Sequence, residues 1–170
     1  MESQLLNIRK NKKLISALLS VVLFAGGAAG VWVMLNRSNN PVTLTPDDIQ
    51  AVAQGQNLYK DNCASCHGEK LEGQPNWKSR NDAGLMPAPP HDQSGHTWHH
   101  ADVLLFELTK FGLSKFAGAD YKSDMPVFSQ TMTDQEIIAV LSFIKSTWPQ
   151  EVRKKHDQIN KAYKQRNENS

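Results

Sequence analysis

The chain has 170 residues, enough for one ordinary domain and a short addition. Its apolar share of 39% excludes a chain disordered throughout, and its mean hydropathy of −0.50 excludes a polytopic membrane protein. Two cysteines exclude a domain stapled by several disulfides. The net charge of +2 lacks the basic excess of a nucleic-acid-binding domain, so no nucleic-acid partner is expected.

Residues 14–35 form an apolar run of 22 residues without a charged side chain. As a helix rising about 1.5 Å per residue, the run would reach roughly 33 Å, enough to cross a hydrocarbon core about 30 Å thick. The four basic residues of segment 1–13 precede it, so the positive-inside rule puts the N-terminus in the cytoplasm and the rest outside. A cleaved signal peptide is the alternative, but its apolar core would be shorter, about 7–15 residues. We therefore predict one uncleaved transmembrane anchor over 14–35.

The exported part divides into a linker, a helical domain over 46–149 and a tail. Residues 36–45 are polar and contain a proline, as in a linker able to extend to about 33 Å. The sequence Thr45-Pro46-Asp47-Asp48 predicts a helix over 46–61, with Thr45 as its N-cap. Apolar residues at helical spacing predict a second helix over 100–111, ended by Gly112.

A third helix is predicted over 133–148, because Thr133-Asp134-Gln135-Glu136 is a capping box and Pro149 follows the apolar stripe. Segments 68–96 and 113–132 lack periodicity and are interpreted as loops. The tail, 150–170, is basic and polar, and either continues as a helix or is disordered. No strand pattern is evident. Such long loops leave a small core, so something further is expected to stabilise the domain.

One motif indicates the chemistry. Cys63-Ala64-Ser65-Cys66-His67 is the CxxCH pattern of c-type haem attachment. Two thiols three positions apart can add to the two vinyl groups of one haem, and the histidine that follows then reaches the iron. A structural zinc site needs four ligands, and a thioredoxin-like CxxC pair needs a βαβ setting; the sequence offers neither. The motif thus favours one covalently attached haem c over a zinc site, a redox pair or a disulfide.

With this motif in place, residues 45–148 resemble a class I, monohaem cytochrome c, and the whole chain resembles a membrane-anchored member of that family. The resemblance implies an all-α fold in which three to four helices and long loops surround one haem c. Gly55 and Tyr59 stand where the family has a glycine and an aromatic residue at the crossing of its first and last helices. Val140 and Phe143 match the partner positions on the last helix.

The resemblance also implies a methionine as the second axial ligand of the iron, opposite His67. Asp124-Met125-Pro126-Val127-Phe128 is similar to the family's MPxF axial segment. Met86 and Met132 are the alternatives, but Met86 precedes the middle helix, and Met132 adjoins the last helix, where a methionine is usually core. We predict four cofactor-binding residues, of which the last two bind the metal: Cys63, Cys66, His67 and Met125.

Residues 89–100 surround this predicted site. Pro89-Pro90 resembles the family segment whose proline carbonyl accepts a hydrogen bond from the axial histidine, but His91 replaces the usual leucine, so either proline fits. Trp98 either bonds a haem propionate or lies in the core. The stretch is rich enough in histidine for a copper or zinc site, yet we favour a polar loop over the haem edge. Its histidines are His91, His96, His99 and His100. His156, in the tail, is predicted to be solvated.

These features predict an electron carrier rather than an enzyme: a c-type cytochrome tethered to the bacterial inner membrane, with its haem domain in the periplasm. Its expected partners are redox proteins such as a quinol-oxidising complex, a dehydrogenase or a terminal oxidase. Two alternatives stay open. One is a haem subunit of a periplasmic oxidoreductase, and the other is a haem-based sensor in which a ligand displaces Met125.

Overall fold

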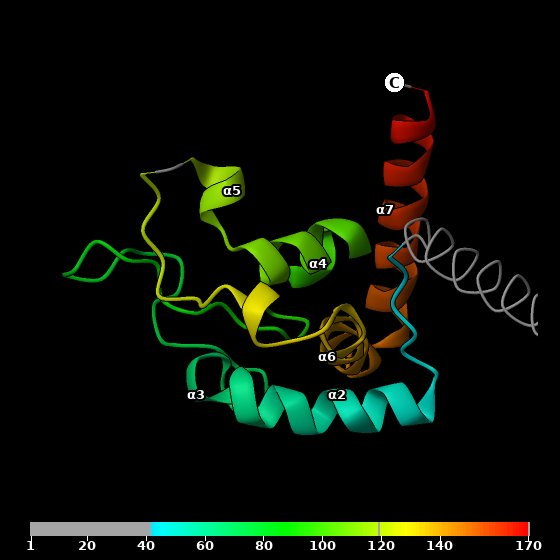
Figure 1. The fold of residues 1–170 in the computed structure, drawn as a ribbon, viewed down its shortest axis with the longest axis horizontal. Helices are drawn as coiled ribbons and strands as arrows, with labels where there is room; N and C mark the ends of the chain where they lie inside the picture. The colour runs from blue at the N-terminus through cyan, green and yellow to red at the C-terminus, as the bar shows by residue number, and fades with distance from the viewer. Residues whose placement is uncertain (1–41, 119, 170) are drawn as a thin grey trace, which may run out of the picture. The chain divides into compact units, whose positions relative to one another are not determined.

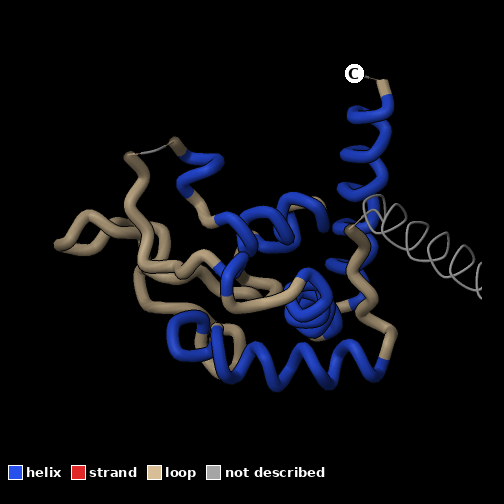
Figure 2. Tube along the Cα trace, viewed as in Figure 1, coloured by secondary structure: helices blue, strands red, loops and turns tan. Residues whose placement is uncertain are grey.

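The computed structural model describes residues 42–118 and 120–169, and in this part every regular element is helical (Figures 1 and 2). The longer helices are α2 (Ile49–Asn62), α4 (Asp102–Phe111), α6 (Asp134–Ser146) and α7 (Gln150–Glu168). Single helical turns lie between them: α3 (Ala64–His67), η1 (Thr97–His99), α5 (Ser114–Ala117) and η2 (Phe128–Gln130). The expected all-helical domain is confirmed, with short turns inside the predicted 113–132 loop.

The predicted membrane anchor, 14–35, lies outside the described residues, as do residues 36–41 of the predicted linker. Among the helices of 42–118 and 120–169, none combines the length and the apolar character that a membrane span requires. The long loops gather on the side of the domain opposite α7 (Figure 2).

α2 begins three residues later than predicted, because Asp48 and not Thr45 is its N-cap. The Asp48 carboxylate accepts hydrogen bonds from the backbone N–H groups of Gln50 and Ala51, at 2.9 and 3.1 Å. The preceding residues form a turn, closed by a hydrogen bond from the Asp48 N–H to the Thr45 carbonyl at 3.1 Å.

The last four residues of the predicted linker belong to the domain, which corrects the expectation of a free tether over 42–45. Leu44 is 4% exposed and lies in the hydrophobic core. Its N–H donates to Oδ2 of Asp102 at 2.9 Å, and the N–H of Thr45 donates to Oγ of Ser142 at 2.9 Å. One buried leucine and two acceptors on distant helices therefore hold this polar segment in place.

The principal helix crossing joins α2 and α6 at Gly55. A Cβ atom added to Gly55 would lie 2.0 Å from the carbonyl oxygen of Ala139 and 3.0 Å from Cβ of Phe143, so the approach requires glycine. One turn later, the Tyr59 ring lies 5.5 Å from the Phe143 ring. The predicted crossing is confirmed, with the Ala139 backbone as the closest neighbour of Gly55 and Val140 buried in the core.

Two further predicted helix ends are confirmed, the start of α6 and the end of α4, whereas α4 begins at Asp102 and α6 ends at Ser146, inside the predicted 100–111 and 133–148. The N–H of Thr133 donates to the Glu136 carboxylate at 2.7 Å, and the N–H of Glu136 donates to the Thr133 hydroxyl at 3.3 Å, which completes the capping box of α6. Gly112 ends α4 with a φ of 81°, in the region that favours glycine.

The tail after Pro149 is the helix α7, which packs against η1. His156 is fully buried on its inner face, so the prediction of a solvated side chain is wrong. Its Nε2–H donates to the carbonyl of His100 at 2.9 Å, and its ring meets the Trp148 ring edge-on at 5.0 Å. His156 is the one fully buried side chain of α7, and the polar composition of the tail conceals it.

Asp102, at the start of α4, is the centre of a buried polar cluster. Besides the Leu44 N–H, its carboxylate accepts a hydrogen bond from Nδ2 of Asn160 at 2.9 Å. Its own N–H donates to Oδ1 of Asn160 at 2.7 Å. Nζ of buried Lys145 and Nε2 of His156 lie 4.0 and 3.5 Å from the same carboxylate. The cluster therefore ties the N-terminal segment and α7 to the body of the domain.

Candidate functional site

The CxxCH residues lie where α2 ends and α3 begins (Figure 1). Cys63 is at the junction: its N–H bonds the Tyr59 carbonyl at 2.8 Å, and its carbonyl accepts the N–H of His67 at 2.9 Å. Both thiols are free. Burial, and then the nearby Cys66, raises the pKa of the Cys63 thiol to about 11, whereas Cys66 is exposed. No disulfide consumes the sulfurs, so both remain available for thioether bonds.

The imidazole of His67 is buried and fixed by the chain itself. Its Nδ1 lies 2.9 Å from the Pro89 carbonyl, and because a carbonyl only accepts, Nδ1 carries the proton and Nε2 keeps its lone pair. Burial lowers the pKa of His67, an effect that the bond to Pro89 partly opposes, so the ring is neutral. A neutral imidazole with its outer nitrogen oriented in this way fits a haem iron. Pro89, and not Pro90, supplies the carbonyl.

Three consecutive carbonyls of the loop 89–91 accept hydrogen bonds from side chains. Pro89 binds His67; Pro90 accepts from Oγ1 of Thr97 at 3.4 Å; and His91 accepts from Nε1 of Trp148 at 2.7 Å. The Trp148 bond attaches the loop to the residues that follow α6. No sequence pattern pointed to the role of Trp148 in holding this loop.

His91 lies directly on the ring of His67. The two ring centroids are 3.9 Å apart and the ring planes differ by 21°. Nδ1 of His91 is 2.8 Å from the hydroxyl of Thr97. Burial, and then the neighbouring His67 and His96, lowers the pKa of His91 well below its usual value, so the stacked pair is neutral.

The structure separates the three candidate methionines. Met132 is 8% exposed and belongs to the core, as expected at that position. Met125 is half-buried against the core, in the loop between α5 and η2, and its N–H bonds Oγ of Ser123 at 3.1 Å. Met86 lies in the long loop between α3 and η1 and is not part of the core cluster. Met125 stays the predicted ligand.

Two of the other histidines of the stretch stack on tryptophans, and the ring of His100 meets that of His96 edge-on at 5.4 Å. His96 stacks on Trp77 at 5.4 Å, and His99 stacks on Trp98 at 3.6 Å. Nowhere in the described ranges do three His, Cys, Asp or Glu side chains come together as a metal ion would require. Trp98 packs half-buried against the core and donates its N–H to the Gln93 carbonyl at 3.3 Å, so its hydrogen bond stays within the loop.

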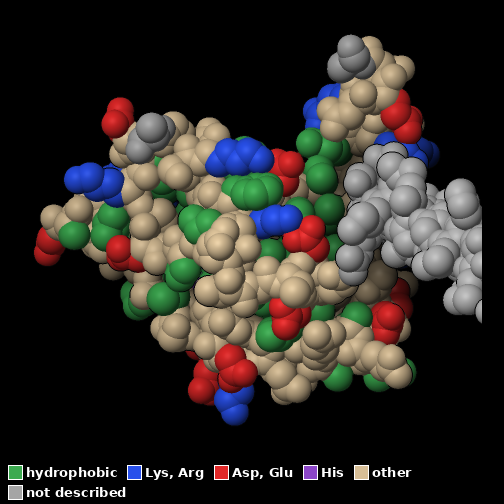
Figure 3. All heavy atoms as spheres, in the orientation of Figure 1, with side chains coloured by type: hydrophobic (Ala, Val, Ile, Leu, Met, Phe, Trp, Pro, Cys, Tyr) green, Lys and Arg blue, Asp and Glu red, His purple; other side chains and the backbone are tan. Residues whose placement is uncertain are grey.

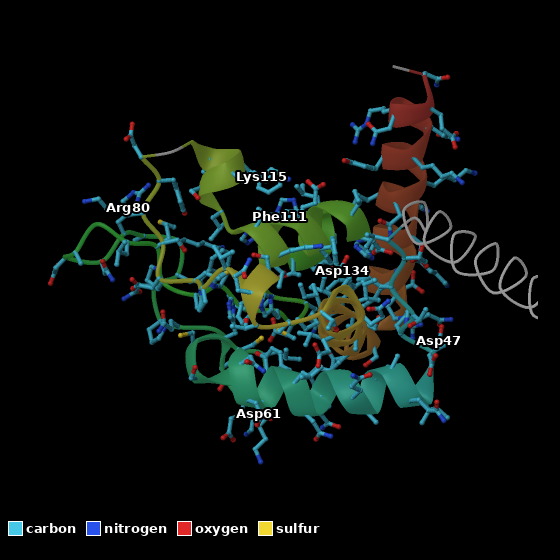
Figure 4. The ribbon with its side chains drawn as sticks, in the orientation of Figure 1. Asp47, Asp61, Arg80, Phe111, Lys115 and Asp134 are labelled. Carbon is cyan, nitrogen blue, oxygen red and sulfur yellow. The ribbon has the colours of Figure 1, made fainter. Side chains whose placement is uncertain are left out.

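Three large apolar side chains on α4, on α5 and after Met125 are exposed, and Figure 3 shows apolar atoms over α4 and α5 beside basic side chains. Phe111, Phe116 and Val127 are 40%, 42% and 48% exposed. Nζ of Lys115 lies 4.3 Å from the centre of the Phe111 ring, and the two side chains are adjacent in Figure 4. We call these three apolar residues the α4–α5 patch.

A family model described as cytochrome c matches residues 52–148, from within α2 to Trp148. The chain belongs to the cytochrome c family. No curated protein and no solved structure matches it. Membership means a covalently attached haem c and a role in electron transfer. The matched range contains the CxxCH motif, the α2–α6 crossing and Met125, and the state of His67 agrees with a ligand to that haem.

Proposed function

We propose that the protein is a single-haem electron carrier that ligates its iron with His67 and Met125, tethered to the periplasmic face of a bacterial inner membrane. The observation that carries the proposal is the ring of His67, with Nδ1 bound to Pro89 and the lone pair of Nε2 left for a metal. Cys63 and Cys66 would hold the porphyrin through thioethers. The haem, when bound, supplies a metal centre that accepts and releases one electron at a time.

Met125 is what favours a carrier over an enzyme. His67 and the Met125 thioether would both bind the iron, so a small molecule would have to displace one of them before it could bind. A thioether opposite histidine also raises the redox potential, which suits electron transfer. The half-buried Met125 side chain packs this segment against the core, and the bond from its N–H to Oγ of Ser123, two residues earlier, is local to the segment.

The α4–α5 patch supports transient docking of a redox partner, since Val127 follows Met125 by two residues and is 48% exposed. Small interfaces, below about 1,200 Å², are typical of electron-transfer encounters. The partners expected are a quinol-oxidising complex, a dehydrogenase or a terminal oxidase.

The proposal of a membrane tether rests on the sequence of residues 1–35, in which four basic residues precede an uncharged run of 22 residues. Membranes washed with carbonate are expected to retain the cytochrome. Its release into the soluble fraction, with a new N-terminus near Gly30, would contradict an uncleaved anchor.

Spectroscopy of the holoprotein tests the ligation. The ferric protein should show the weak far-red band of an iron–sulfur bond, lost in Met125→Ala and kept in Met86→Ala, the matched control outside the core. Met132→Ala should also keep the band, although it loses about 2–5 kcal/mol of unfolding free energy as a buried methionine. Rapid, stoichiometric binding of CO to the reduced wild type would contradict the closed site and favour an enzyme or a sensor.

Mass spectrometry tests the attachment residues. The intact mass of the wild type should exceed that of the apoprotein by one haem. Cys63→Ser/Cys66→Ser, expressed with the same haem-attachment machinery, should show no covalent addition.

A further inference from the structure

We propose that His91 is a positioning residue for the axial ligand: its imidazole, stacked on the ring of His67, sets the rotation of that ring about the bond from Nε2 to the metal. The inference rests on the proposed ligation by His67, and it goes further by assigning a role to a residue that the ligand set does not include.

The bond to Pro89 does not by itself fix the plane of the His67 ring. A carbonyl accepts hydrogen bonds over a broad range of directions, so the ring can rock about the line from Nδ1 to the oxygen. A second restraint must act on the face of the ring. His91 supplies it, with a centroid distance of 3.9 Å and an angle of 21° between the planes.

His91 is itself held at three points. Its N–H donates to the Leu71 carbonyl at 2.8 Å, its carbonyl accepts from Nε1 of Trp148 at 2.7 Å, and its Nδ1 bonds the Thr97 hydroxyl at 2.8 Å. The Tyr59 ring also meets it edge-on at 6.4 Å. Backbone and ring are therefore both fixed before any metal is bound, which is how a supporting residue preorganises a ligand.

The orientation of an axial imidazole has a direct spectroscopic readout. In a low-spin ferric haem, the plane of the imidazole helps to decide how the unpaired electron is distributed over the porphyrin. The order and spread of the hyperfine-shifted haem methyl signals in the proton NMR spectrum follow from that distribution. A residue that merely filled space near His67 would affect stability without altering this pattern.

Two substitutions at position 91 separate stacking from bulk. His91→Leu keeps an apolar side chain but removes the ring, and we expect it to change the order or spread of the methyl signals. His91→Phe restores a flat ring, so it should return the pattern toward wild type. His99→Leu is the matched control, since His99 belongs to the same stretch but is exposed and has no contact with His67.

A third variant keeps the test decisive should His91→Leu fail to fold. Thr97→Val removes the hydroxyl that holds Nδ1 of His91 while keeping the shape of the buried side chain, and it should shift the methyl pattern in a folded protein; Thr97→Ser should restore it. A folded His91→Leu with the wild-type pattern would overturn the role of His91. If His91→Leu does not fold, a wild-type methyl pattern in Thr97→Val would overturn the role of His91 instead. The far-red band of the wild type is measured separately, and its absence would count against the proposed function instead.

Discussion

Leu44 donates its backbone N–H to Oδ2 of Asp102 at 2.9 Å, although the two residues are 58 positions apart in the chain. The other oxygen of the same carboxylate accepts Nδ2 of Asn160 on α7. One buried side chain thus binds both the segment that enters the domain and the helix that leaves it. Lys145, 4% exposed, lies beside it.

Asp102→Ala is expected to lower the free energy of unfolding by about 2–3 kcal/mol, because it leaves the buried N–H of Leu44 unpaired, while Lys145 keeps its closer partner, Asp157, at 2.7 Å. Denaturant titration of the holoprotein measures the loss. Asp47→Ala is the matched control: the Asp47–Arg153 pair also joins the N-terminal segment to α7, at 2.6 Å, but the Asp47 side chain is 83% exposed. The control should lose no more than about 1 kcal/mol. Equal losses would contradict the central role of Asp102.

Gly55→Ala is expected to destabilise the protein by about 1–3 kcal/mol, because the new Cβ meets the carbonyl of Ala139 and forces α2 away from α6. Gln56→Ala, at the next and exposed position of the same helix, should be close to neutral. In an open helix, alanine would instead stabilise by up to about 1 kcal/mol relative to glycine. A gain in stability for Gly55→Ala, read from thermal or denaturant unfolding, would therefore exclude the close crossing.

The stability of the protein should fall as the pH decreases below about 6.5, and His156 contributes to this fall. Its Nδ1 is buried without a hydrogen-bond partner. Burial, and then Lys145, lowers the pKa of His156, with Asp102 opposing in part. In the unfolded chain His156 takes up a proton near pH 6.5, whereas in the folded chain it does so only at a lower pH. The stability that neutral His156 contributes is therefore fully present above pH 6.5 and is lost as the pH falls toward the pKa of the folded state.

For this one group the loss is at most about 1.4 kcal/mol for each pH unit below 6.5. Unfolding free energies at pH 7.5 and 5.0 should therefore differ less in His156→Gln than in the wild type. His99→Gln, an exposed histidine, should keep the wild-type difference. His96 and His100, whose pKa values burial also lowers, leave part of the slope in every variant. An unchanged slope in His156→Gln would contradict the assignment.

The features that could be predicted from the sequence are those in which residues close in the chain act together. The CxxCH motif and the capping box of Thr133 and Glu136 are local patterns, and the structure places both at helix ends. The start of α2 differs from the prediction because Thr45 and Asp48 are both N-cap residue types, and the contact that places Thr45 outside the helix, its N–H to Oγ of Ser142 on α6, joins residues 97 positions apart. His156 was missed for a similar reason: its partner is a carbonyl 56 residues away. The stack of His91 on His67 joins a loop to the end of α3, and no sequence periodicity reports it.

The three bound carbonyls of residues 89–91 determine where this chain tolerates a change of length. Each accepts from a different element, namely His67 at the end of α3, Thr97 in η1 and Trp148 after α6. A single inserted or deleted residue there would put all three acceptors out of register at once. The hydrogen bonds of the loop 80–85 stay mainly within that loop. Nη1 of Arg80 donates to the Gly84 carbonyl, and the N–H of Leu85 donates to Oδ1 of Asn81. We therefore expect the chain to tolerate an insertion, a tag or a grafted peptide at residues 82–84. This site is separated along the chain from the loop 89–91, which holds His67 in place.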